Sequence, residues 1–139
     1  TMTIEQAGAR YEELVAPANC SGATFIQTAA GFEATTPMVE VETTLRPLAV
    51  EAADAYEAFG SGMDAEAWPS EAEAAAASVA QRAHDQADAY RAVADAPDTQ
   101  SFRVALDDLA DLERQPRPSG GLRAVLGLEG SQRIADFRC

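Results

Sequence analysis

The residue best suited to acid–base or metal chemistry is His84, the only histidine of the chain. Asp88 follows one helical turn later, and a carboxylate that orients an imidazole is a common feature of general bases and metal ligands. A serine hydrolase would also need an activated nucleophile, and the chain contains no G-x-S-x-G turn. We therefore expect His84 to be an ordinary histidine on a helix surface beside a carboxylate, and we predict no catalytic residue.

The many carboxylates raise the question of a metal centre. A di-iron bundle would need two Glu-x-x-His motifs, but Gln81 stands where His84 would need its glutamate, and there is no second histidine. Acidic clusters such as 107–111 lack the spacing of a calcium loop and are typical of solvated helix faces. We predict no metal site, no cofactor-binding residue and no cofactor.

Two cysteines, Cys20 and Cys139, lie near opposite ends of the chain. Together with one histidine they are too few for a four-ligand zinc site. They fit either an extracytoplasmic disulfide or two buried, reduced thiols. We predict the disulfide, because Cys139 ends a tail that would fray unless it were docked or cross-linked.

Trp68 is the lone tryptophan and precedes Pro69 at an expected helix entry. It could line a ligand pocket between helices. The alternative, which we favour, is that Trp68 closes one end of the hydrophobic core.

Composition narrows the function further. The net charge is −13, the pI is about 4.2, and all ten basic residues are arginine. Such a chain lacks the clustered cations that nucleic acids require, and without lysine it has neither a P-loop lysine nor a Schiff base. No stretch approaches the length of a membrane span. Because the chain opens on Thr1 and Met2, we expect a trimmed or processed N-terminus whose leader has been removed.

Apolar residues recur every three or four positions, as one face of a helix requires. These runs predict helices over 1–34, 36–60, 64–95 and 99–114, followed by a C-terminal helix or arm over 121–139. Prominent members of the runs are Tyr11, Phe25, Leu45, Phe59, Val79, Tyr90, Phe102 and Leu109. The pattern predicts an all-α fold, a single antiparallel four-helix bundle over residues 1–139.

Helix boundaries follow from local signals. Thr3 and Gln6 are spaced as a capping box, as are Ser70 and Glu73. Thr36 precedes Pro37 as an N-cap would. The other signals predict a kink or split at Pro17, a kink or late start at Pro47, a helix end at 60–62 and a poorly ordered segment over 115–121.

Three segments suggest a family: Tyr11-x-x-Leu-Val-Ala-Pro-x-Asn19, Leu45-Arg-Pro-Leu48 and Leu122-Arg-Ala-Val-Leu-Gly-Leu128. With the all-arginine basic set, the chain resembles Ala-rich helical lipoproteins and secreted proteins of high-GC actinobacteria, a family of unknown function. The resemblance implies a helical bundle outside the cytoplasm, behind a removed leader. It implies no activity, and it transfers no functional residue.

We therefore expect a non-enzymatic, extracytoplasmic bundle that binds a protein or another component of the cell envelope. The acidic charge favours a cationic or neutral partner, met through a helix face or the 116–121 loop. The alternatives are a small-molecule carrier with an apolar slot between helices and, third, an enzyme. Contact with a membrane is expected only through the leader or a lipid anchor.

Overall fold

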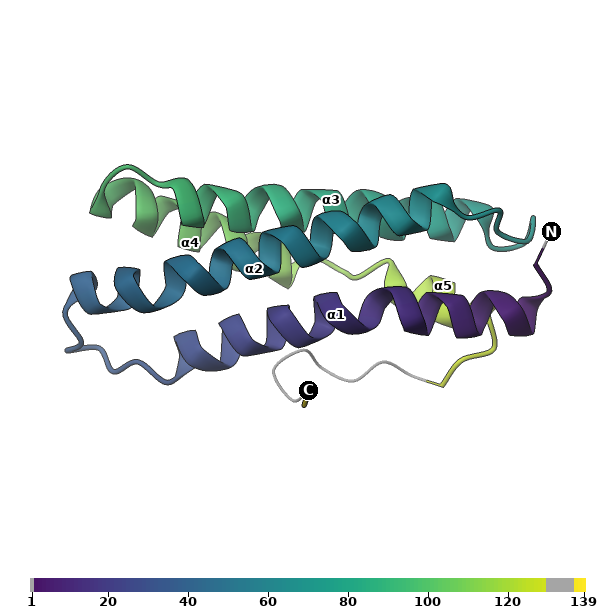
Figure 1. The fold of residues 1–139 in the computed structure, drawn as a ribbon, viewed down its shortest axis with the longest axis horizontal. Coiled ribbons are helices and arrows are strands. Elements are labelled where there is room, and N and C mark those ends of the chain that lie inside the picture. Colours follow the sequence, from purple (N-terminus) through teal and green to yellow (C-terminus); the bar gives the residue numbers. More distant parts are fainter. Residues whose placement is uncertain (1, 130–136) are drawn as a thin grey trace.

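The computed structural model describes residues 2–129 and 137–139, and all regular structure within them is helical. Its helices are α1 (Ile4–Ala30), α2 (Met38–Ala65), α3 (Glu73–Asp95), α4 (Thr99–Arg114) and the short α5 (Ser119–Val125). Figure 1 shows the four long helices side by side and alternating in direction. The predicted all-α antiparallel bundle is therefore confirmed. Since both α4 and α5 pack against α3, the fourth position of the bundle is shared by two helices.

The core is formed mainly by the predicted apolar faces, and it is tightest between α2 and α3. Alanines dominate that contact and are almost fully buried, so the two backbones approach closely. Larger residues fill the centre of the bundle: the Tyr56 ring stacks on Tyr90 with 5.5 Å between centroids, and the Phe25 ring meets Tyr90 edge-on at 5.1 Å. Such aromatic contacts are favourable beyond the area they bury.

The start of α1 agrees with its sequence signal, whereas the start of α2 is displaced. Thr3 and Gln6 form the predicted capping box, with each side chain bonded to the other residue's backbone N–H. At the second helix Pro37, not Thr36, is the N-cap, and the Thr36 hydroxyl accepts from the backbone N–H of Glu33 instead. The Thr36 hydroxyl, predicted to cap α2, thus forms a hydrogen bond within the loop before that helix instead.

Pro17 and Pro47 each lie inside a continuous helix. The predicted split near Ala16 and the late start near Pro47 are therefore wrong. Both proline side chains are exposed, so the carbonyl left without a donor one turn earlier can be hydrated and the helix can continue.

The predicted helix end at 60–62 is also wrong, because α2 continues to Ala65. A Cβ atom at Gly60 would lie 2.8 Å from Cε1 of His84, and one at Gly62 would lie 2.7 Å from Cδ2 of Leu14. Both separations are too short for carbon atoms in contact. The glycines therefore admit side chains from α3 and α1, and this packing outweighs their low helix propensity.

The third helix starts at Glu73 and not near residue 64, because residues 66–72 form the link from α2. The Ser70 hydroxyl bonds to Glu71, and the N-cap is Ala72, which has no side-chain acceptor. The predicted capping box of Ser70 and Glu73 is thus absent.

The fourth helix has the predicted bounds. Its N-cap, Asp98, accepts from the backbone N–H of Ser101 at 2.7 Å, and this hydrogen bond lowers the pKa of the Asp98 carboxyl. Residues 119–121, expected in a poorly ordered loop, form the first turn of α5. Within the predicted segment 121–139, Leu122 and Leu126 are buried, and residues 130–136 lie outside the described part of the chain.

Candidate functional site

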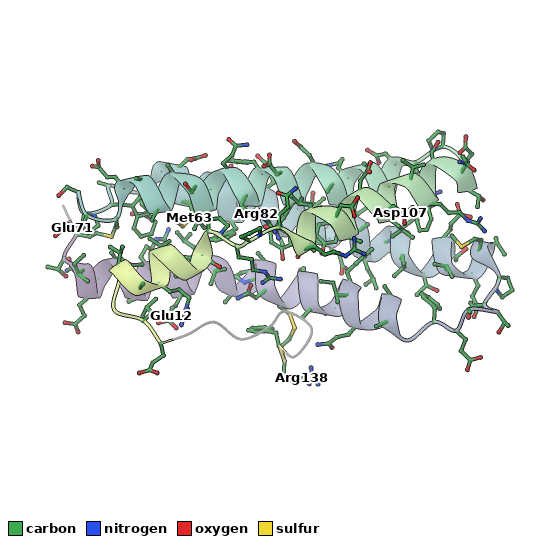
Figure 2. The ribbon with its side chains drawn as sticks, turned by 180° about the vertical axis from the view of Figure 1, so that it is seen from behind. Glu12, Met63, Glu71, Arg82, Asp107 and Arg138 are labelled. Atoms are coloured by element: carbon green, nitrogen blue, oxygen red, sulfur yellow. A yellow bond between two sulfur atoms is a disulfide. The ribbon has the colours of Figure 1, made fainter. Side chains whose placement is uncertain are left out.

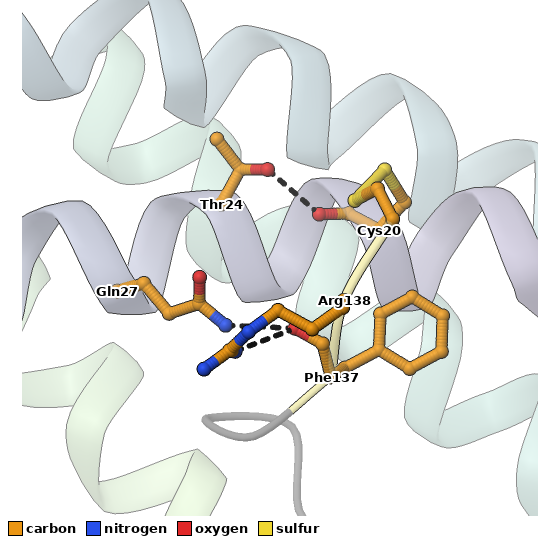
Figure 3. The surroundings of a disulfide bond; sticks show 6 residues. Cys20, Thr24, Gln27, Phe137 and Arg138 are labelled. Atoms are coloured by element: carbon orange, nitrogen blue, oxygen red, sulfur yellow. Dashed lines mark hydrogen bonds between the residues drawn. A yellow bond between two sulfur atoms is a disulfide. The ribbon is translucent and has the colours of Figure 1, made fainter.

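A disulfide joins Cys20, in the middle of α1, to Cys139 at the C-terminal end of the chain, with 5.2 Å between the Cα atoms. Figure 3 shows the last residues lying against α1, where the Gln27 side-chain amide donates to the carbonyl of Phe137 at 2.8 Å. The pairing predicted from sequence is therefore present. A disulfide of this kind fits an oxidising space outside the cytoplasm.

Among the helices that the structure describes, none has the length and apolarity needed to span a bilayer.

Trp68 closes one end of the core, as the favoured interpretation expects. It is 7% exposed, and its indole Nε1–H donates to the carbonyl of Met63 at 2.8 Å. Trp68 is not among the residues that line the two hollows described below, so the alternative of a ligand pocket at this residue remains a hypothesis. The hydrogen bond fixes the ring over the end of α2.

His84 lies between two carboxylates of α2, neither of which is Asp88. Its Nε2 is 2.8 Å from Oδ2 of Asp64, and its Nδ1 is 3.2 Å from Oε2 of Glu57. The hydrogen bond with Asp64 raises the pKa of His84, desolvation opposes it, and Glu57 adds to the rise. Both ring nitrogens are thus engaged, so His84 ties α3 to α2 as a partly exposed bridge that is an ion pair when the imidazole is protonated. Within residues 2–129 and 137–139, no three His, Cys, Asp or Glu side chains gather as metal ligands would.

The first hollow is a small, partly open cavity where α4 gives way to α5. It has a volume of about 60 Å³ and lies between α1, α2, α3 and the α4–α5 link. Its apolar wall includes Val15, Phe59 and Val79, and its polar wall includes Arg82 and Arg117. We call it the Arg82 cavity. Of the lining residues, only those of the 116–121 loop are predicted from the sequence as a candidate contact with a partner.

Arg82 is 9% exposed and extends from α3 to the end of α4 (Figure 2). One terminal nitrogen donates to the carbonyl of Leu112 at 2.7 Å and to that of Gln115 at 3.3 Å, and the other donates to Pro116 at 3.4 Å. The Leu112 carbonyl also accepts from the backbone N–H of Gln115 at 3.1 Å, and Arg82 adds side-chain donors to the carbonyls at and just beyond this helix C-terminus. The break at Pro116 and Pro118 is therefore held in place by a buried cation of α3.

The second hollow is an open groove of about 440 Å³ at the α3–α4 turn. Ala92, Ala96 and Val104 contribute apolar surface, and the carboxylates of Asp95 and Asp108 also line it. Val104 is 49% exposed and is one of few large apolar side chains that the described residues leave in solvent. We call this hollow the α3–α4 groove.

Comparisons of the chain with protein-family models, curated proteins and solved structures found no match.

Proposed function

We propose that this chain is a non-enzymatic, extracytoplasmic module that binds a basic, amphipathic segment of another envelope protein in the α3–α4 groove. The proposal rests on one observation: apolar surface and carboxylates are combined in one open hollow. An amphipathic helix could lay its apolar face into such a groove, and cationic side chains on that helix would meet the acidic residues.

The charge around the groove supports a basic partner and disfavours nucleic acid and anionic lipid. Asp95 of α3 and Asp108 of α4 line the groove. Asp107 and Asp111 also lie on α4, and Asp98 is its N-cap. Arg91, the nearest cation on α3, is paired with Asp54 at 3.2 Å, whereas the exposed Arg103 next to Val104 sets one positive charge against these five carboxylates. Anionic polymers and surfaces would be repelled here, whereas a cationic segment would be attracted and its association accelerated.

The runner-up, a carrier with an apolar slot between helices, receives less support. Ligand pockets for drug-sized molecules typically measure about 300–1,000 Å³ and enclose most of the ligand surface. The Arg82 cavity measures only about 60 Å³, and the α3–α4 groove is large enough but open to solvent. An enzyme receives least support, because His84 bridges two carboxylates and does not line either hollow. The disulfide supports a place in the envelope, where the chain is either secreted or held by a lipid anchor.

The test is a titration of the full chain with a fluorescent, Lys/Arg-rich amphipathic helical peptide, beside the same peptide with Glu in place of its basic residues. Only the basic peptide is expected to bind, and its affinity is expected to fall as salt rises. Asp95→Asn/Asp108→Asn is expected to weaken binding about tenfold if two charge-assisted contacts are lost.

Asp85→Asn/Asp88→Asn is the matched control. It changes the net charge by the same amount, at two positions of α3 that do not line the groove. Equal weakening by both double variants would show non-specific attraction to an acidic surface. Binding of the acidic peptide would also contradict the proposal.

A further inference from the structure

The α3–α4 groove has a floor of small apolar side chains. Ala105 of α4 is buried there, Ala96 at the end of α3 is half-buried, and Val104 stands beside them half exposed. Among the described residues, none that lines the groove carries a positive charge, and Arg103 points elsewhere on α4 without lining it. A second helix can therefore approach the floor closely, and cations on that helix meet no repulsion from the lining.

The two carboxylates of the groove lie on opposite walls and at opposite ends. Asp95 is the last residue of α3, so it lies next to the turn that leads into α4. Asp108 lies on the α4 wall, eight residues after Gln100, which lines the groove in the first turn of that helix. Eight residues of an α-helix rise about 12 Å. The two negative charges are thus separated by about 12 Å along the groove, with Val104 between them.

A helix bound along the groove can answer this diagonal with one spacing. If an apolar side chain faces the floor, the residues four positions before and four positions after it lie about 40° to either side of it and about 12 Å apart along the axis. Residues three positions before and after it lie about 60° to either side, on the reversed diagonal, and only about 9 Å apart. The spacing of four matches the separation of Asp95 and Asp108.

We propose that the groove recognises a helix that carries an apolar anchor and a cation four residues to either side of it. The anchor packs beside Val104, and the two cations pair with Asp95 and Asp108. This inference rests on the function proposed above and specifies its partner. Turning the bound helix end for end exchanges the two cations, so both directions of the partner helix satisfy the pattern.

The test is a titration of the full, disulfide-bonded chain with two fluorescent helical peptides of identical composition. The matched peptide has an arginine four residues before and four residues after a leucine anchor. The shifted peptide has the arginines three residues before and after that leucine. The matched peptide is expected to bind about tenfold more tightly, because the shifted peptide can pair only one arginine at a time with a carboxylate.

Charge reversal on α4 identifies the carboxylate that the partner contacts. Asp108→Arg is expected to weaken binding of the matched peptide at least about tenfold. It is expected to restore binding to a third peptide, which has glutamate in place of one of the two arginines. Asp107→Arg is the control, because it makes the same change of charge at the neighbouring exposed position, which does not line the groove. It should bind the matched peptide nearly as the native chain does, and circular dichroism checks that both variants fold.

The outcomes separate this inference from the function on which it rests. Equal affinity for the matched and shifted peptides would overturn the spacing and leave the preference for a basic helix intact. Equal weakening by Asp107→Arg and Asp108→Arg would overturn it as well, because the peptide would then be held by the acidic surface in general. If neither peptide binds, both the proposed function and this inference are wrong.

Discussion

The Arg82 cavity and the α3–α4 groove lie toward opposite ends of α4, and they differ in almost every physical respect. The cavity lies past the C-terminal end of α4, where two prolines stop the helix, and it is small and cationic. The groove lies beside the first half of α4, where the helix runs unbroken along α3, and it is open and acidic. One helix therefore borders two surfaces of opposite charge.

The difference shows that net charge does not describe what this bundle can bind. The value of −13 predicts a preference for cations over the whole surface, and the groove agrees with it. The cavity does not, because Arg82 is placed by the need to pair the last carbonyls of α4. The arginine that pairs the carbonyls at the end of α4 thus places a positive charge in a chain whose net charge is negative.

The largest expected effect on stability comes from removing the disulfide, which is expected to act more strongly on α1 and α5 than on the groove. Cys139→Ser opens a loop with a sequence separation of 119 and is expected to lower the free energy of unfolding by roughly 5 kcal/mol in the chain-entropy model. Urea denaturation measures this loss. By hydrogen exchange, amides that exchange through global unfolding should all lose protection by this amount, and amides of α1 near Cys20 and of α5 should lose more because they also open locally. A uniform loss of protection would mean that the two regions do not differ in this respect.

A second prediction distinguishes the floor of the groove from the core beneath it. Phe102 is fully buried on α4, with the guanidinium of Arg46 5.0 Å from its ring centre, whereas Val104 is half exposed on the same helix. Phe102→Ala should therefore lower the free energy of unfolding by about 3–5 kcal/mol. Val104→Ala should change it by less than about 0.5 kcal/mol. Similar losses in urea melts would place Val104 in the core and remove the groove as a binding surface.

The sequence predicts what depends on periodicity and on strong local signals. The apolar faces of α1 to α4, the capping box at Thr3 and the bounds of α4 all follow from residues a few positions apart. The disulfide could also be predicted, because the chain has only two cysteines and one of them ends it.

What could not be predicted depends on contacts between helices. Gly60 and Gly62 look like a helix end until the side chains of His84 and Leu14 are seen to occupy the space above them. The partners of His84 lie on another helix, so the local spacing to Asp88 misleads. A signal for the Arg82 cavity did exist: an arginine on the apolar side of a helix, facing a segment with two prolines. Only the packed bundle brings the two together.

A third prediction concerns the support that Arg82 gives to the end of α4. Arg82→Met keeps an apolar stem but removes the donor to the carbonyls of Gln115 and Pro116, and it removes one of the two donors to the carbonyl of Leu112. The expected loss in free energy of unfolding is about 1–3 kcal/mol. Arg114→Met, at an exposed position of the same helix end, should change it by less than about 0.5 kcal/mol. If thermal melts show no loss for Arg82→Met, the arginine does not hold the break between α4 and α5.

The smallest expected effect is a pH dependence of the free energy of unfolding. It arises at His84, which lines neither hollow. The pKa of His84 is raised in the folded chain, chiefly by its hydrogen bond with Asp64. A raised pKa stabilises the fold fully below the unfolded value near 6.5, and this contribution disappears as pH rises through the folded pKa. Relative to His84→Gln, the native chain should therefore lose stability over the pH range that begins near the unfolded value of 6.5 and extends upward through the folded pKa. A difference that stays constant across this range in urea melts would mean that the bridge to α2 is not charged.

The central claim, that the α3–α4 groove is a binding surface for a basic amphipathic segment, is tested most directly by residue-resolved NMR of the full chain during titration with the basic peptide. The expected shifts lie along residues 92–108, and those near the Arg82 cavity stay unchanged. Val104→Ser is expected to weaken binding about fivefold, because part of an apolar contact is lost, whereas Val125→Ser, at an exposed valine of α5 outside the groove, should have no effect. Shifts that spread over all acidic faces, or equal weakening by the two serine variants, would contradict the account.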